Sequence, residues 1–132
     1  MKKLLVLFTL YFFSCSHPAE QPNTAMDTGR SFIRATLDGD FKSAEPLLLK
    51  DEKNTELFES FKRIYERLPA EKKRSYKEAS YTINEYKDVN DSVSLINYSN
   101  SFMKQPLDIK LVRSDKAWKV DFKYTSEGAG AE

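Results

Sequence analysis

The stretch LDIKLVRSDKAWKVDFKY (residues 107–124) decides the fold, because apolar and polar residues alternate along it with a period of two. Leu107, Ile109 and Leu111 share one side of the first run, and Trp118 and Val120 share one side of the second. The polar residues between the two runs supply a turn. The sequence therefore predicts an antiparallel hairpin with one apolar face.

Charge pairing predicts the register of this hairpin, since directly opposed residues of an antiparallel pair share a face. In one register Lys110 faces Asp121; shifted by two residues, Lys110 faces Lys119 and the like charges repel. Each opposite-charge pair contributes roughly 0.2–1 kcal/mol, so we predict the first register, with residues 114–117 as a four-residue loop. The other predicted pairs are Asp108 with Lys123, Ile109 with Phe122, Leu111 with Val120 and Arg113 with Trp118.

Two earlier segments, residues 81–86 and 93–98, alternate in the same way, and polar turns at residues 88–91 and 104–106 separate the runs. We therefore expect four antiparallel strands. The residues assigned to the apolar face of the sheet include four polar candidates for a ligand pocket: Tyr81, Glu85, Asn97 and Tyr124.

Three helices are expected before the strands, because the apolar period from residue 24 to residue 79 is helical. Thr24 and Asp27 have capping-box spacing at the start of the first helix, which ends near Gly39. The second helix is short and runs from Asp40 to Leu48. The third has an uninterrupted apolar face formed by Leu57, Phe58, Phe61, Ile64, Tyr65 and Leu68, and Pro69 interrupts it.

The fold class predicted from these elements is α+β, with three N-terminal helices packed on a four-stranded antiparallel sheet. Gly29, inside the first helix, costs about 1 kcal/mol relative to Ala, so we expect it to mark a close approach to a neighbouring element.

Composition excludes several classes of site. Of 132 residues, 21 are Lys or Arg and 20 are Asp or Glu, so no net charge recruits nucleic acid. The chain has one cysteine and one histidine, His17, which rules out an internal disulfide and removes the usual metal ligands and general base. We therefore expect no catalytic residue, no metal and no cofactor.

The N-terminus has the organisation of a signal peptide. Two lysines precede an apolar run over residues 4–13, which as a helix reaches only about 15 Å. The residues Phe12-Phe13-Ser14-Cys15 resemble the cleavage box of bacterial lipoproteins. The resemblance implies that residues 1–14 are removed and that Cys15 carries lipid; the alternatives are a buried first helix and a free thiol.

The lipoprotein resemblance also implies a location. Cys15 anchors the protein to a membrane of the bacterial cell envelope, and Ser16, in place of an aspartate, favours the outer membrane over the inner. We expect residues 15–23 to form the lipidated tether, residues 24–125 the folded domain and residues 126–132 a disordered tail.

Two further segments, FIRATLDGDFKSA (residues 32–44) and LVRSDKAWKV (residues 111–120), resemble the two ends of a nuclear-transport-factor-2-like domain. The resemblance implies a cone, in which a curved sheet wraps around the helices. This superfamily includes isomerases, lyases and non-catalytic binding modules, so the fold leaves the function open.

Two functions are compatible with these features of the sequence. The first is a non-catalytic envelope lipoprotein that binds a small apolar ligand or a protein partner. The alternative is a hydro-lyase or isomerase with Glu85 as the base, which requires Glu85 to be buried in a cavity. A homodimer is also expected, through an apolar patch on the outer sheet face formed by Tyr86, Ile96, Tyr98 and Val112.

Overall fold

The computed structural model describes residues 24–103 and 105–128. The predicted signal peptide (residues 1–14), the tether with Cys15 (residues 15–23) and residues 129–132 of the predicted tail lie outside the described residues. In the described part of the chain, no helix combines the length and apolar character needed to cross a membrane.

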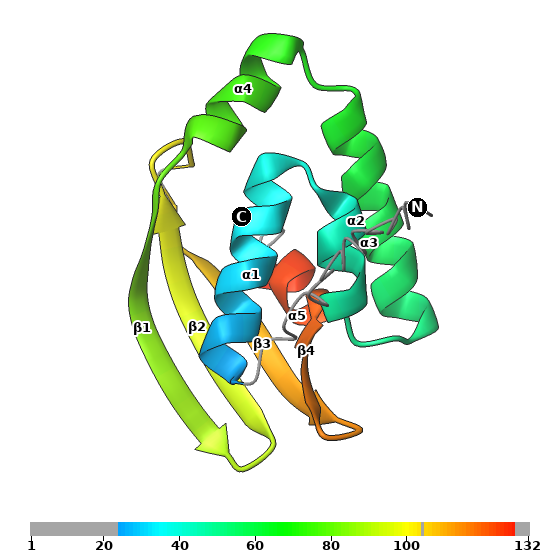
Figure 1. The fold of residues 1–132 in the computed structure, drawn as a ribbon, viewed down its shortest axis with the longest axis vertical. Coiled ribbons are helices and arrows are strands. Elements are labelled where there is room, and N and C mark those ends of the chain that lie inside the picture. The colour runs from blue at the N-terminus through cyan, green and yellow to red at the C-terminus, as the bar shows by residue number, and fades with distance from the viewer. Residues whose placement is uncertain (1–23, 104, 129–132) are drawn as a thin grey trace, which may run out of the picture.

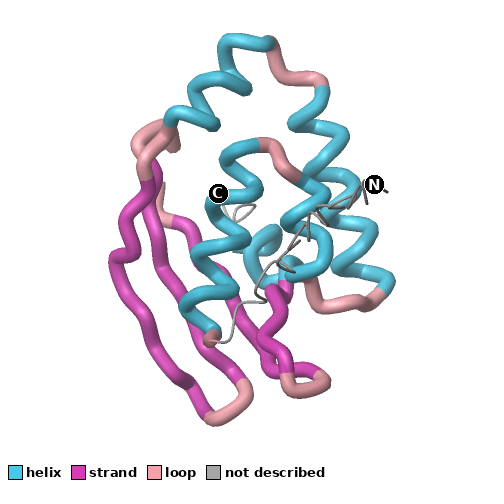
Figure 2. Tube along the Cα trace, in the orientation of Figure 1, coloured by secondary structure: helices cyan, strands magenta, loops and turns pink. Residues whose placement is uncertain are grey.

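The fold is α+β, with a four-stranded antiparallel sheet in the order β1-β2-β3-β4 (Figure 1). The elements are α1 (Ala25–Asp38), α2 (Phe41–Ala44), the 3-10 helix η1 (Glu45–Leu47), α3 (Glu52–Glu66), α4 (Ala70–Glu78), β1 (Tyr81–Asn90), β2 (Val93–Asn100), β3 (Leu107–Ser114), β4 (Ala117–Asp121) and α5 (Phe122–Gly128). Helix α1 lies along the curved sheet, while α3 and α4 extend past one end of it (Figure 2). The main core lies between α1, the sheet and α3.

Helix α1 begins and ends where its sequence predicts. The Asp27 backbone amide donates to Thr24 Oγ1 at 3.0 Å, which confirms the N-terminal cap. At the other end Gly39 adopts a left-handed conformation with φ of 71°, and its amide bonds to the carbonyls of Ala35 and Thr36. The chain can therefore turn sharply into α2, whose N-cap is Asp40.

The expectation of three helices before the sheet is wrong, because α4 forms a separate helix after α3. Pro69 lies at the N-cap of α4, where the missing N–H of proline costs no helical hydrogen bond. It therefore ends one helix and begins the next.

A β-bulge in β1 changes which side chains face the helices. Ile83 pairs with Tyr98, but Glu85 pairs with Asn97, so Asn84 is the extra residue. The bulge moves Glu85 to the outer face, although it alternates in sequence with the inner residues Tyr81 and Ile83.

The prediction of which β2 residues face the helices is also wrong. Ser94, Ile96, Tyr98 and Asn100 face inward, and Ile96 and Tyr98 are 0% and 8% exposed. The predicted dimer patch is therefore wrong: Ile96 and Tyr98 are core residues, while Val112 is half-buried on the outer face and Tyr86 is 37% exposed. Because both faces of this strand carry apolar residues, alternation alone could not distinguish them.

The predicted hairpin register is confirmed over β3 and β4: Lys110 pairs with Asp121, Leu111 with Val120 and Arg113 with Trp118. The loop is shorter than predicted, because Ser114 and Ala117 still pair and only two residues turn the chain. Asp115 and Lys116 both have positive φ, of 49° and 64°, as a type I′ turn requires.

The chain leaves the sheet earlier than predicted. Phe122 begins α5, so the predicted pairs of Asp108 with Lys123 and of Ile109 with Phe122 do not form. Helix α3 holds this turn, since the Lys123 amide donates to Asn54 Oδ1 at 2.8 Å and Lys123 Nζ donates to Asp51 Oδ2 at 2.7 Å. Residues 126–128, predicted as tail, belong to α5.

Gly29 marks the predicted close approach, between α1 and the sheet. A Cβ atom at this position would overlap Cδ1 of Ile96 and lie 3.4 Å from Cδ1 of Leu111. Both neighbours are fully buried, which leaves them little room to move.

We expect Gly29→Ala to destabilise the domain, because overpacking of about 1–3 kcal/mol outweighs the gain of about 1 kcal/mol in helix propensity. Ile96→Val removes the overlapping methyl group and alone costs about 0.5–1.5 kcal/mol. The double variant should lose less stability than the sum of the two single losses, by about 0.5 kcal/mol or more. Urea unfolding measures all three losses. Strictly additive costs would contradict the contact.

Candidate ligand cavity

A cavity of about 420 Å³ opens between α1, α3, α4, α5 and one end of the sheet. Its volume falls within the range of roughly 300–1,000 Å³ typical of small-molecule sites. Most of its wall is apolar, and the apolar lining residues include Phe32, Leu37, Leu57, Phe61, Leu107 and Ile109. Such a wall favours an apolar ligand.

Six of the lining residues carry hydroxyl groups, and Asn100 carries an amide. The hydroxyl groups belong to Thr36, Ser60, Tyr65, Tyr76, Tyr98 and Thr125. The described lining residues include no acidic or basic side chain. The wall can therefore form hydrogen bonds with a ligand but offers it no counter-charge.

The hydroxyl of Thr125 is the polar atom whose hydrogen bonding is incomplete. It is buried and, among the described residues, the only buried side-chain nitrogen or oxygen without a hydrogen-bond partner. Thr36, by contrast, donates to the carbonyl of Phe32 at 2.9 Å or of Ile33 at 3.0 Å. A buried hydroxyl without a partner costs about 1–3 kcal/mol.

Tyr98 shows how strongly the cavity disfavours charge. Burial raises the pKa of its phenol to about 12, and the nearby Tyr76 adds to the shift. The shift reflects the low polarity around the hydroxyl, which disfavours a charged group there.

The cavity is positioned by contacts on two sides. On one side, Asn54 of α3 holds the first turn of α5 and so places Thr125 at the cavity wall. On the other, Asn100 Oδ1 accepts hydrogen bonds from the amides of Phe102 and Met103, at 3.0 and 2.6 Å, and shapes the connection from β2 to β3. The first contact joins two helices, and the second stabilises a turn.

Exposed apolar side chains identify the mouth of the cavity. Ile64 lines it and is 61% exposed, the largest value among the exposed large hydrophobic residues of the described chain. Nearby, the ring of Tyr76 packs on Phe102 with centroids 4.5 Å apart, and Tyr76 also packs on Tyr65 at 6.1 Å. The mouth therefore lies between the end of α3, α4 and the β2–β3 connection.

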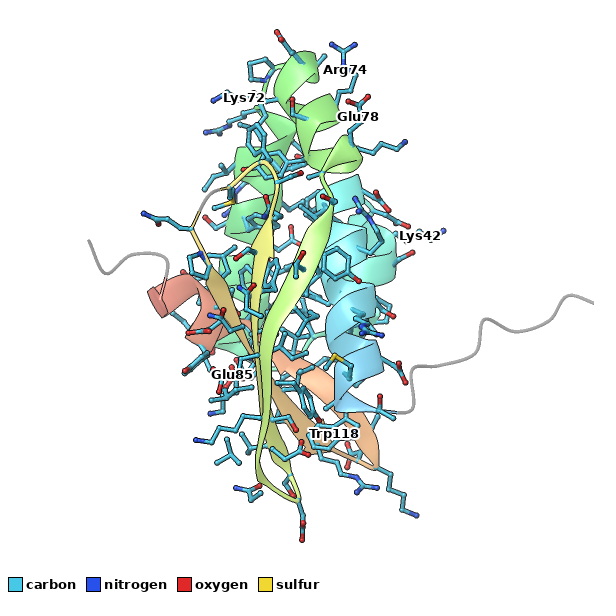
Figure 3. All side chains as sticks on the ribbon, turned by 90° about the vertical axis from the view of Figure 1, so that its left-hand side faces the viewer. Lys42, Lys72, Arg74, Glu78, Glu85 and Trp118 are labelled. Atoms are coloured by element: carbon cyan, nitrogen blue, oxygen red, sulfur yellow. The ribbon has the colours of Figure 1, made fainter. Side chains whose placement is uncertain are left out.

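None of the four polar residues predicted for the pocket lines this cavity. Glu85 is exposed on the outer sheet face, well away from α4 (Figure 3). Asn97 lies opposite it and donates to Asp108 Oδ1 at 2.7 Å. Tyr81 packs half-buried against the core, and Tyr124 is 38% exposed on α5, with Lys110 Nζ 5.9 Å from its ring centroid.

Sequence reasoning missed the residues that line the cavity because helices and strand ends supply them together. One signal was present: the apolar pattern of α3 continues through Ile64 and Tyr65 to Leu68, just past the end of the helix, and all three residues line the cavity. An apolar helix face that extends beyond the elements packed on it indicates a second contact or a cavity.

Residues 24–103 and 105–128 contain no group of three or more His, Cys, Asp or Glu side chains placed to hold a metal ion. Comparison of the chain with protein-family models, with curated protein sequences and with solved structures found no match.

Proposed function

We propose that this protein is a lipid-anchored lipoprotein of the bacterial cell envelope whose domain binds a small apolar ligand without catalysing a reaction. The cavity carries the proposal, because it has a largely apolar wall and no charged side chain among the described lining residues. The packing of α1 on the sheet is compatible with a nuclear-transport-factor-2-like cone, which we propose as the fold family. Attachment through Cys15, and the outer membrane as the site of attachment, rest on the N-terminal sequence.

The position of Glu85 gives no support to the alternative of a hydro-lyase or isomerase that uses it as the base. A general base must lie within hydrogen-bond reach of its substrate, usually in a pocket that shifts its pKa. Glu85 is exposed and does not line the cavity.

A neutral fluorescent probe tests cavity binding. The probe is N-phenyl-1-naphthylamine, and the protein used is the chain of residues 16–132, which keeps every described element. This shortened chain should bind the probe saturably, with a rise in fluorescence. Ser60→Trp puts a large ring into the cavity and should weaken binding by about tenfold or more, since 1.4 kcal/mol of lost contact is sufficient. Thr55→Trp is the control, on the exposed side of the same helix. A folded chain that does not bind the probe, or that binds it equally well with Trp at position 60, would refute cavity binding.

Replacing Cys15 with Ala should abolish lipidation and release the protein from membranes, because the proposed anchor depends on one thiol. The measurement is incorporation of labelled palmitate, together with fractionation after a high-salt wash. Ser16→Ala is the neighbouring control and should stay membrane-bound. Retention of the Cys15→Ala protein in the membrane fraction would overturn the anchor.

A further inference from the structure

The mouth of the cavity lies in the most basic segment of the chain. From Lys62 to Lys77 there are seven basic and two acidic residues, although the whole chain is nearly balanced at 21 to 20. The same segment contributes Ile64, Tyr65, Leu68 and Tyr76 to the cavity wall. The segment that supplies this part of the cavity wall is therefore strongly basic.

Most of these basic side chains are not neutralised by neighbouring acids. Among the ion pairs of the described residues, only one includes a member of this set, Lys62 with Glu59 at 4.0 Å. Lys73 Nζ donates to the carbonyl of Glu66 at 2.7 Å and lies 5.8 Å from the ring centroid of Tyr65. Lys72 and Arg74 are exposed and project from the outer end of α4 (Figure 3).

The cavity interior and its mouth have opposite preferences for charge. Inside, the described lining residues include no acidic or basic side chain, and burial raises the pKa of the Tyr98 phenol. At the mouth, Lys73 Nζ lies over the ring of the lining residue Tyr65, and Lys72 and Arg74 are exposed on the same helix. A molecule that matches both parts has an apolar chain and one anionic end.

We infer that the cavity takes a single-chain anionic amphiphile, of the chemical class of a long-chain fatty acid. The chain would lie among Phe61, Leu107 and Ile109, and the carboxylate would stay at the mouth beside the basic side chains of α4. This inference rests on the proposed function, since it requires that the cavity bind an apolar ligand at all.

Matched competitors test the inference. Laurate and dodecanol have the same chain length and differ at the head group, and both can displace the neutral probe from the chain of residues 16–132. We expect laurate to compete about tenfold more strongly at about 0.01 M salt, and the difference to shrink at about 1 M salt, where the Debye length falls from about 30 Å to 3 Å. Dodecanol controls for the effect of salt on apolar binding.

Charge variants locate the anionic head. Replacing Lys72, Lys73 and Arg74 together with Gln should weaken laurate binding several-fold and leave dodecanol unchanged. The control replaces three exposed lysines elsewhere, Lys42, Lys50 and Lys87, with Gln and changes the net charge equally. Thermal unfolding verifies that both triple variants are folded.

The outcomes separate this inference from the proposed function. If the probe and dodecanol bind but laurate has no advantage, or if both triple variants weaken laurate equally, the anionic ligand is wrong and cavity binding stands. If Ser60→Trp leaves laurate binding intact, laurate adsorbs at the surface and the inference is overturned. If none of the three ligands binds, the proposed function fails as well.

Discussion

Replacing Phe58 with Ala is expected to lower the free energy of unfolding by about 3–5 kcal/mol, the largest effect of any single substitution considered for this chain. Phe58 is 2% exposed and lies at the centre of an aromatic cluster. Its ring centroid is 5.5–6.3 Å from those of four other phenylalanines: Phe32, Phe41, Phe61 and Phe122. Truncation leaves a void that rings from α1, α2, α3 and α5 all border, so no single movement can fill it.

Urea unfolding followed by circular dichroism measures this effect. Phe102→Ala is the matched control: Phe102 is 37% exposed and contacts one ring, that of Tyr76, so its removal should cost less than about 1.5 kcal/mol. Equal losses for the two variants would show that the cluster does not hold the helices together.

Replacing Asn54 with Ala should cost about 2–4 kcal/mol, because Asn54 is fully buried and its side chain joins three elements. Asn54 Nδ2 donates to Asp51 Oδ2 at 2.9 Å and to Asp121 Oδ1 at 3.2 Å, while Oδ1 accepts from the Lys123 amide at 2.8 Å. The variant removes the hydrogen bonds that Asn54 makes to the Lys123 amide and to Asp121 Oδ1.

Asn84→Ala provides the control for Asn54, since Asn84 Nδ2 also makes two side-chain hydrogen bonds, to Asn97 Oδ1 and Ser99 Oγ. These bonds are exposed on the outer sheet face, where water can replace them, so the loss should stay within about 0.5 kcal/mol. The Asn54 variant should also bind the neutral probe more weakly, because α5 carries Thr125. A loss at Asn54 no larger than that at Asn84 would contradict its role in the core.

Local sequence determined the elements whose interactions lie within a few residues or across one hairpin. The cap at Thr24, the left-handed Gly39 and the break at Pro69 each act on their own turn of the chain. The register of β3 and β4 follows from charge and apolar pairs that face each other directly, and its prediction was confirmed. Gly29 was recognised for the same reason, since an unfavourable residue inside a helix needs a compensating contact.

Tertiary structure alone decided the features that depend on distant parts of the chain. The bulge at Asn84 moves Glu85 to the outer face. Two consecutive polar residues, Asn84 and Glu85, interrupt the alternation in β1, but only the pairing with β2 shows that this interruption is a bulge. Asp121 and Lys123 continue the alternation of a strand, yet the chain enters α5 at Phe122. Hydrogen bonds that join Asn54, far away in the chain, to Asp121 and Lys123 stabilise this change. The cavity depends on several elements at once. It is a volume left open where α3 and α4 extend beyond the sheet, and residue periodicity describes which side chains are buried, not the space between them.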